Sequence, residues 1–266
     1  ITENTKAIIA VDMGGQLCDY HRLRDICNKH NLVLIEDAAH SFGAQESKCP
    51  KSPKVGSFAD FTTLSFHPVK NITTGEGGCL ITNKKDLKIK FDNFRSHGMV
   101  TIKNQVASLK KQMKFLGYNY RISDINCALG ITQLNKIKKF LDKRKLIAKI
   151  YNKSFSKYSN IFTIPEFSKE CEPAYHLYPL RINFKKLKIN KKKLINVLSK
   201  KYKINLQIHY NPIYNQPYFK KKYNFNKNSF PITNDFFYKV VSLPIFYSLK
   251  NKDIYQIVKI IIKLCK

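Results

Sequence analysis

One lysine in this chain has the surroundings of a nucleophile rather than those of a surface charge. Lys70 lies between apolar runs at residues 58–66 and 79–82, and a glycine-rich turn follows it at residues 75–78. Most lysines in proteins are solvated, but the neighbours of Lys70 are apolar and hydroxyl residues and not a run of charges. An amine in a loop at the end of a buried strand is partly desolvated, which lowers its pKa from about 10.4. A neutral amine of this kind can condense with an aldehyde.

A carboxylate follows another apolar run. Residues 32–35 have the pattern of a buried parallel strand, and Glu36 and Asp37 come directly after it. Ligands bind at the carboxyl ends of strands in open α/β sheets. A carboxylate there can keep a ring nitrogen protonated, as pyridoxal phosphate requires when its ring accepts electrons. An aspartate after a strand is equally often a helix N-cap, so Asp37 alone leaves both interpretations open.

The elements that must position these two residues are predicted by the hydrophobic pattern of the first half. Strand-like runs alternate with a helical pattern, which indicates a βαβ unit followed by two further strands. The predicted elements are a strand at 6–11, a helix at 21–30, a strand at 32–35, an exposed proline-rich loop at 47–54, and strands at 58–66 and 79–82. A long helical pattern at 122–158, with a break near 138–142, then leads into the second half.

The second half has a different pattern of predicted strands and helices. Its predicted elements are a strand at 178–183, a helix at 191–202, a strand at 204–210 and a helix at 253–264. This order indicates a small α+β domain with a helical cover. We therefore expect two domains, a large α/β domain at 1–140 and a small α+β domain at 141–266.

The net charge of +30 raises the possibility of a nucleic-acid partner. The lysines are spread over most of the second half and form no patch interleaved with aromatic residues, which favours solvated faces over a nucleic-acid groove. A positive field would also attract an anionic small-molecule ligand. No apolar run is long enough to cross a membrane, so we expect neither nucleic acid nor a membrane as partner.

The seven cysteines are scattered and contain no C-x-x-C pair. This pattern indicates neither a zinc site nor a disulfide framework, and we expect no bound metal. Reduced thiols in a cytoplasmic protein fit it best.

Taken together, the motifs resemble those of the DegT/DnrJ/EryC1/StrS family of sugar-nucleotide aminotransferases. The matching segments, in the order of the family, are 11–16, 36–44, 55–57, 65–78, 96–98, 116–124, 174–178 and 208–212. The resemblance implies the type I fold of the aspartate aminotransferase-like enzymes that use pyridoxal phosphate. The chain would then hold the C-terminal half of the large domain and the small C-terminal domain.

The same resemblance implies roles for individual residues. Pyridoxal phosphate would be attached to Lys70, which would also move a proton as acid and base. Asp37 would pair with the ring nitrogen, and Ser65 would bind the phosphate, although a hydroxyl at a strand end also bonds to backbone. His40 would lie at the ring face or its phenolic oxygen, with a helix-start histidine as the equal alternative. Asn119, otherwise a turn residue, would reach the cofactor phosphate of a neighbouring subunit, which implies a twofold homodimer with a shared active site.

Four further residues are candidate contacts of the sugar nucleotide, and packing is an equally good interpretation of each: His67, Arg121, His209 and Tyr210. The lysine segment and the His209 motif are most like those of the pseudaminic-acid branch. Enzymes of that branch aminate C4 of a UDP-linked 4-keto-6-deoxy-N-acetylhexosamine. Family members that dehydrate or epimerise sugars replace the lysine with histidine, so Lys70 favours transamination, with an amino-acid donor that is most often glutamate.

Three alternatives stay open at the level of sequence. A perosamine-type or 3-keto-sugar aminotransferase would share the fold and the lysine. A truncated, non-catalytic remnant is the second, because a family member begins about 100 residues, or one small domain, before Ile1. That upstream part would hold the turn that grips the cofactor phosphate and the aromatic residue that stacks on its ring. A nucleic-acid binder is the third and rests on charge alone.

Overall fold

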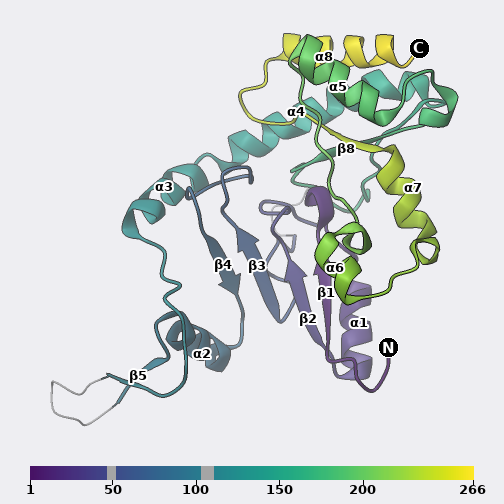
Figure 1. Cartoon of the computed structure of the whole chain (residues 1–266). Helices are drawn as coiled ribbons and strands as arrows, with labels where there is room; N and C mark the ends of the chain where they lie inside the picture. Colours follow the sequence, from purple (N-terminus) through teal and green to yellow (C-terminus); the bar gives the residue numbers. More distant parts are fainter. Residues whose placement is uncertain (47–51, 103–110) are drawn as a thin grey trace. The chain divides into compact units, whose positions relative to one another are not determined.

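The computed structural model describes residues 1–46, 52–102 and 111–266 (Figure 1). They form two compact units. The first consists of residues 1–137 together with 170–173, and the second of residues 138–169 together with 174–266. The first five residues of the loop expected at 47–54 lie outside the described part of the chain.

The first unit is built on a four-stranded mixed sheet (Figure 1). Its strands are β1 (Ala7–Val11), β2 (Val33–Asp37), β3 (Phe61–Ser65) and β4 (Gly78–Ile81), in that order across the sheet. The first three are parallel, and β4 is antiparallel to β3. The four strands expected in the first half of the sequence are thus confirmed. The loop between β3 and β4, which holds Lys70, opens at the edge where β2 also ends.

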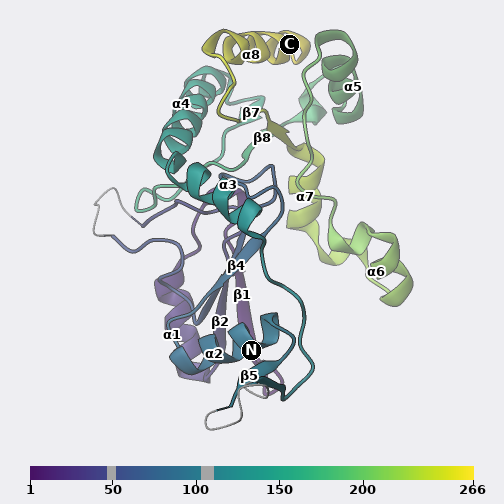
Figure 2. The ribbon, with the colours of Figure 1, turned by 90° about the vertical axis from the view of Figure 1, so that its left-hand side faces the viewer.

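Strand register divides the sheet into a covered face and an exposed one. Ala10 pairs with Glu36, and Glu36 with Thr62, so these three buried residues share a face. Helix α1 (Tyr20–His30) lies against the sheet (Figure 2). On the opposite face the apolar side chain of Ile9 is 64% exposed. Asp37 belongs to this second face, because it pairs with Thr63, the neighbour of Thr62.

The ends of the helices follow local rules. Asp19 caps α1 by accepting a hydrogen bond from the Arg22 N–H at 3.1 Å, and Asn31 ends the helix in the left-handed conformation. Ser123 caps α3 (Asp124–Leu134) in the same way. The long helical pattern predicted at 122–158 is present, but the break expected near 138–142 is at residues 135–136. Helix α3 ends at Leu134, and α4 (Ile137–Phe155) begins three residues later and continues through 138–142.

A small subdomain at the end of helix α2 (Lys85–Arg95) depends on close contact between two backbone segments. It includes the antiparallel pair of β5 (Met99–Thr101) and β6 (Lys111–Met113). Gly98 has a φ of +69°, and a Cβ built on it would lie 1.8 Å from the Phe115 carbonyl oxygen. No side chain fits in that space.

We expect Gly98→Ala to lower the free energy of unfolding by more than about 3 kcal/mol, because it adds a backbone clash to the strain of a positive φ. Gly75 is the matched control. Its φ is +81°, but a Cβ there would meet only the side-chain amide of Asn126 at 3.3 Å, so Gly75→Ala should cost about 1 kcal/mol. Urea unfolding measures the free energy of unfolding of both variants. Equal losses of stability would contradict the close approach of Gly98 to the Phe115 carbonyl.

The second unit packs helices on a three-stranded antiparallel sheet. The strands are β7 (Phe162–Thr163), β8 (Tyr178–Ile182) and β9 (Val240–Leu243), in the order β7-β8-β9. The helices are α4, α5 (Lys191–Tyr202), α6 (Pro217–Lys222), α7 (Pro231–Lys239) and α8 (Asn251–Leu264). Short 3-10 helices occur in both units, at Met13–Gly15, Ser156–Tyr158, Phe184–Lys186, Ile213–Asn215 and Lys227–Ser229. The predicted helices at 191–202 and 253–264 are confirmed.

A continuous hydrophobic core fills this second unit. Fully buried side chains from three helices meet those of the sheet, namely Ile147, Tyr151, Phe155, Leu194, Leu198, Ile254, Ile261, Tyr178, Leu180 and Ile182. Arg144 is also buried, and its Nη1 donates hydrogen bonds to the carbonyl oxygens of Tyr175, His176 and Ile245 at 3.0–3.1 Å. Burial lowers the pKa of Arg144 to about 10, which leaves it charged at neutral pH.

One predicted strand is wrong. Residues 204–210 form only an isolated bridge, in which Gln207 and Ser242 exchange backbone hydrogen bonds at 3.2 and 2.8 Å. The alternation that suggested a strand is still meaningful, since Ile204 and Leu206 are buried. The pattern reports which side chains face the core, whereas a strand also requires a continuous ladder. Among the described residues, no helix is both long and apolar enough to cross a membrane.

Candidate active site

Lys70 lies in a loop that is closed at its base by backbone hydrogen bonds. The Phe66 N–H donates to the Gly77 carbonyl at 2.9 Å, and the Thr74 N–H donates to the Phe66 carbonyl at 3.1 Å. Within the loop the Lys70 N–H donates to the His67 carbonyl at 2.9 Å. These hydrogen bonds fix the conformation of the loop that holds Lys70.

Two asparagines fasten this loop to its surroundings. The Asn71 side-chain amide donates to the Phe42 carbonyl at 3.0 Å, which ties the loop to the turn after β2. The Asn126 amide of α3 donates to the Thr74 carbonyl. Neither contact was predicted from the sequence, because each joins residues that are far apart in the chain. The only available signal for Asn71 was its position directly after Lys70.

Lys70 and Asp37 are electrostatically coupled. Burial lowers the pKa of the Lys70 ammonium below its usual range, and the nearby Asp37 carboxylate partly opposes that shift. Asp37 is the last residue of β2, and its Oδ1 accepts a hydrogen bond from the Ala39 N–H at 3.1 Å. The helix N-cap left open by the sequence is not what the structure has, because a turn and not a helix follows β2. Asp37 caps the turn, and its charge reaches the lysine.

His40 is buried in the turn that follows β2 and not at the start of a helix. Its Nδ1 lies 3.3 Å from the Gly14 N–H, which donates to it. An imidazole that accepts a backbone N–H at Nδ1 carries its proton on Nε2. His40 is thus fixed in the same turn that begins after Asp37.

Ser65 and His67 lie where β3 enters the lysine loop. The Ser65 hydroxyl is within 3.5 Å of the His67 N–H. His67 is exposed, and its Nε2 is 3.8 Å from a carboxylate oxygen of Glu76, on the other side of the loop. These residues share the carboxyl edge of the sheet with Asp37 and Lys70.

The remaining candidates lie elsewhere. Asn119 and Arg121 are exposed in the first unit, and an isolated bridge between Asn119 and Ser96 holds their segment to the end of α2. His209 and Tyr210 belong to the second unit, where the His209 Nδ1 is 2.8 Å from the Ser242 Oγ. The structure thus groups five of the nine candidate residues at one sheet edge.

The residues at this edge match the chemical needs of pyridoxal phosphate. A partly desolvated amine suits its aldehyde, a strand-end carboxylate suits its ring nitrogen, and a hydroxyl suits its phosphate. The buried Oδ1 of Asn71, next to the lysine, also has no hydrogen-bond partner among the described residues. An unpaired buried acceptor at this position fits a site that receives a ligand with donors.

Glu36 is a buried carboxylate on the covered face of the sheet, and we expect it to set a pH dependence of stability. Its Oε2 accepts hydrogen bonds from the Thr62 hydroxyl at 2.6 Å and the Gly56 N–H at 3.0 Å. Its buried Oε1 has no partner among the described residues. Burial raises the pKa of Glu36 from 4.5 to about 7.

The folded chain therefore holds this proton more tightly than the unfolded chain. The contribution of Glu36 to stability is complete below pH 4.5 and is lost as the pH rises to about 7. Glu36→Gln mimics the protonated form, so it should flatten this part of the profile, which amounts to on the order of 3 kcal/mol. Urea unfolding at a series of pH values measures the free energy of unfolding of both proteins. If its slope against pH is the same in Glu36→Gln as in the unaltered protein, the raised pKa of Glu36 is wrong.

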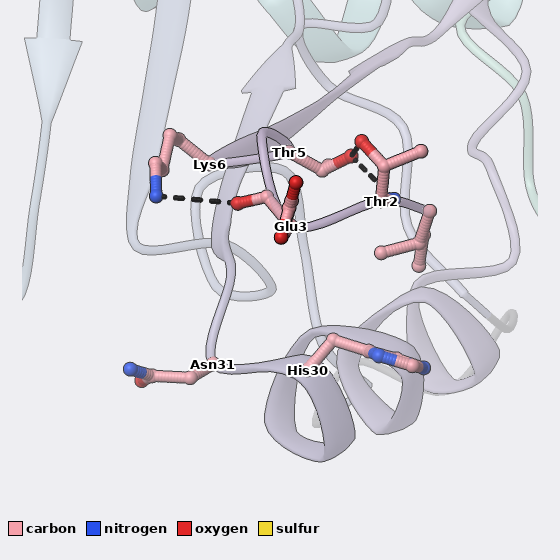
Figure 3. A pocket seen from close by; sticks show the side chains of 7 residues that line it. Thr2, Glu3, Thr5, Lys6, His30 and Asn31 are labelled. Atoms are coloured by element: carbon pink, nitrogen blue, oxygen red, sulfur yellow. Dashed lines mark hydrogen bonds between the residues drawn. The ribbon is translucent and has the colours of Figure 1, made fainter.

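Described residues of the first unit line two hollows that differ in their position on the sheet. One, of about 670 Å³, is mostly apolar and extends from the lysine loop to α2 and α3, with Phe66, Thr74, Leu80, Phe94 and Ile131 in its wall. The other, of about 540 Å³, is lined by the first residues of the chain with His30 and Asn31 (Figure 3). It lies before β1 and β2, at their amino ends. Because ligands of open α/β sheets bind at the carboxyl ends, the hollow of Figure 3 is not a candidate active site.

A lysine on a loop at the carboxyl edge of this sheet, close to a strand-end aspartate, fits the class of the type I enzymes that use pyridoxal phosphate. The profile of the DegT/DnrJ/EryC1/StrS aminotransferase family matches residues 1–262, and the chain belongs to this family. The expected fold and cofactor are thereby confirmed.

Known relatives agree with this assignment. The UDP-4-amino-4,6-dideoxy-N-acetyl-beta-L-altrosamine transaminase of Campylobacter jejuni strain 81-176 is 38% identical over 93% of this chain and 62% of its own length. The structure of Helicobacter pylori PseC, an aminotransferase involved in the biosynthesis of pseudoaminic acid, matches with a TM-score of 0.88 and 32% identity, over all of this chain and 68% of PseC. The sugar aminotransferase Spr1654 of Streptococcus pneumoniae, named as putative and solved in its PLP form, matches with a TM-score of 0.86 and 26% identity over 100% of this chain and 69% of its own. The chain thus spans about two thirds of these proteins.

Proposed function

We propose that this chain acts in the transamination of a UDP-linked 4-keto-6-deoxy-N-acetylhexosamine, with an amino acid, glutamate first among them, as donor. The observation that carries the proposal is the coupling of Lys70 to Asp37 at the carboxyl edge of the sheet. The names of the Campylobacter jejuni and Helicobacter pylori relatives support the sugar and a place in pseudaminic-acid biosynthesis.

The net reaction exchanges an amino group for a carbonyl oxygen. The donor is oxidised at Cα to a 2-oxo acid, and the keto carbon of the sugar is reduced to an amine, so no outside oxidant or reductant is needed. When bound, the cofactor supplies an aldehyde that takes up the amino group and a ring that accommodates the electron pair. Lys70 would take the Cα proton of the donor as a base and would give it, as an acid, to the cofactor carbon that carries the amino group.

The other residues bind and orient in this proposal. Asp37 keeps the ring nitrogen protonated, and Ser65 donates to the phosphate. Asn119 would reach the phosphate in the partner of a homodimer, so each site would be shared. Its exposed position at the end of α2 leaves it accessible to a second subunit. His40 would contact the ring.

The sugar nucleotide would be bound by four side chains, His67, Arg121, His209 and Tyr210. We place the reaction in the cytoplasm, because the six described cysteines are all free, as expected in a reducing compartment.

A comparison of two keto-sugar nucleotides as amino-group acceptors tests this proposal. The purified chain is loaded with pyridoxal phosphate and incubated with glutamate, then with the UDP-linked 4-keto-6-deoxy-N-acetylhexosamine or with a GDP-linked 4-keto-6-deoxyhexose. Release of 2-oxoglutarate and conversion of the sugar carbonyl to an amine are measured by mass spectrometry, with Lys70→Ala as the control. Amination of the UDP sugar supports the proposal. Amination of the GDP sugar instead would indicate a perosamine-type enzyme. If neither sugar is aminated, the proposal that this chain is active is wrong.

A further inference from the structure

A second acidic residue, Asp12, lies directly after β1 and is fully buried. Its carboxylate accepts three hydrogen bonds, from the Cys18 N–H at 3.0 Å, the Tyr20 hydroxyl at 2.9 Å and the Ser41 hydroxyl at 2.6 Å. A buried carboxylate requires partners of this kind, and together they saturate much of its acceptor capacity. Sequence motifs placed Asp12 in the family pattern but gave it no role.

The three donors come from two sides of the carboxylate. Cys18 and Tyr20 belong to the start of α1 and the loop before it, whereas Ser41 belongs to the turn after β2. That turn begins with Asp37 and includes His40. It is closed by a hydrogen bond from the Ser41 N–H to the Ala38 carbonyl at 3.1 Å.

Two more contacts join the same pair of segments. The Asp12 N–H donates to the Asp37 carbonyl at 3.1 Å, and the Gly14 N–H donates to the His40 Nδ1 at 3.3 Å. With the bond from Ser41 to the Asp12 carboxylate, the turn is held at its first residue, at its histidine and at its last residue. The segment 12–14 therefore sets the position and the tautomer of the groups that the turn presents.

We propose that Asp12 is a positioning residue for the cofactor, which acts through Ser41 to fix the turn that presents Asp37 and His40. This inference rests on the proposed function, because the turn matters only if pyridoxal phosphate binds there. The alternative is that Asp12 only fixes α1 to the end of β1. In that case the hydrogen bonds from Cys18 and Tyr20 would stabilise the fold, and the bond from Ser41 would not affect cofactor binding.

Two variants separate these roles, because each removes one hydroxyl donor from the same carboxylate. Ser41→Ala removes the bond on the turn side. Tyr20→Phe removes the bond on the α1 side and keeps the aromatic ring, which stacks on Phe58 with ring centroids 4.9 Å apart. Both should lower the midpoint of thermal unfolding of the cofactor-free protein, since each leaves the buried carboxylate one donor short.

Cofactor binding should respond differently. The dissociation constant of pyridoxal phosphate, measured by fluorescence titration, should rise about tenfold in Ser41→Ala and less than about twofold in Tyr20→Phe. The visible absorption band of the bound cofactor is the second readout, because it reports the charge beside the ring rather than stability. It should shift in Ser41→Ala alone.

The results distinguish this inference from the proposed function. An unchanged dissociation constant in Ser41→Ala, or an equal rise in both variants, would overturn the positioning role and leave the function standing. If the unaltered protein does not bind pyridoxal phosphate, the proposed function fails, and this inference is overturned with it.

Discussion

Replacing Lys70 with alanine will abolish the covalent attachment of pyridoxal phosphate at the lysine loop. The amine of Lys70 has a pKa lowered by burial, so a larger fraction of it is neutral and nucleophilic than for a solvated lysine. After incubation with the cofactor and reduction with borohydride, peptide mass spectrometry should find the pyridoxyl group predominantly on Lys70 in the unaltered protein. In Lys70→Ala that peptide should be unlabelled.

A second desolvated lysine provides the matched control. Lys191 in α5 has its pKa lowered to about 8 by burial. Its Nζ donates to the Phe237 carbonyl at 2.5 Å and lies 4.7 Å from the centre of the Phe237 ring. No carboxylate shifts its pKa. If a low pKa alone directed labelling, Lys191 would be modified as readily as Lys70. Labelling concentrated on Lys191, or spread over surface lysines, would sink the assignment of Lys70.

The parts of the site that the sequence predicted follow local rules. Lys70 sits between two strands, and Asp37 ends a third, so position relative to the strands was enough to bring both to one edge of the sheet. The tautomer of His40 and the buried carboxylate of Asp12 were not predictable in this way. Their partners lie in other segments, and the Ser41 hydroxyl that donates to Asp12 is 29 positions away.

The helices show the same division between local and distant information. The apolar spacing predicted α3, but it did not predict that Ile125 and Ile131 would be 84% and 63% exposed. Helical periodicity identifies an apolar face and says nothing about what covers it. The failed strand at 204–210 is the converse case, because its alternation correctly marked the buried side chains but not the missing ladder.

Asp37→Asn will separate the electrostatic role of this residue from its role as a cap. Asparagine has the same shape, and its amide oxygen can still accept the hydrogen bond that the Ala39 N–H donates to Oδ1 at 3.1 Å. What is lost is the negative charge that raises the pKa of Lys70. In the cofactor-free variant the pKa of Lys70 should therefore fall further, and the pH profile of its acylation, followed by mass spectrometry, should move to lower pH.

The loss of this charge should have a still larger effect on the rate of the reaction. Without a carboxylate, the ring nitrogen is no longer held in its protonated state, and the half-reaction with the amino donor should slow by about 100-fold or more. Glu36→Gln is the matched control at a pH above about 7, where the Glu36 carboxyl is ionised, since there it also removes a negative charge from β2 but on the covered face. It should leave both the acylation profile of Lys70 and the half-reaction close to those of the unaltered protein. An Asp37→Asn variant whose Lys70 profile does not move would show that the carboxylate is only a cap, and the charge partner of the ring would then have to be sought among other residues at this edge.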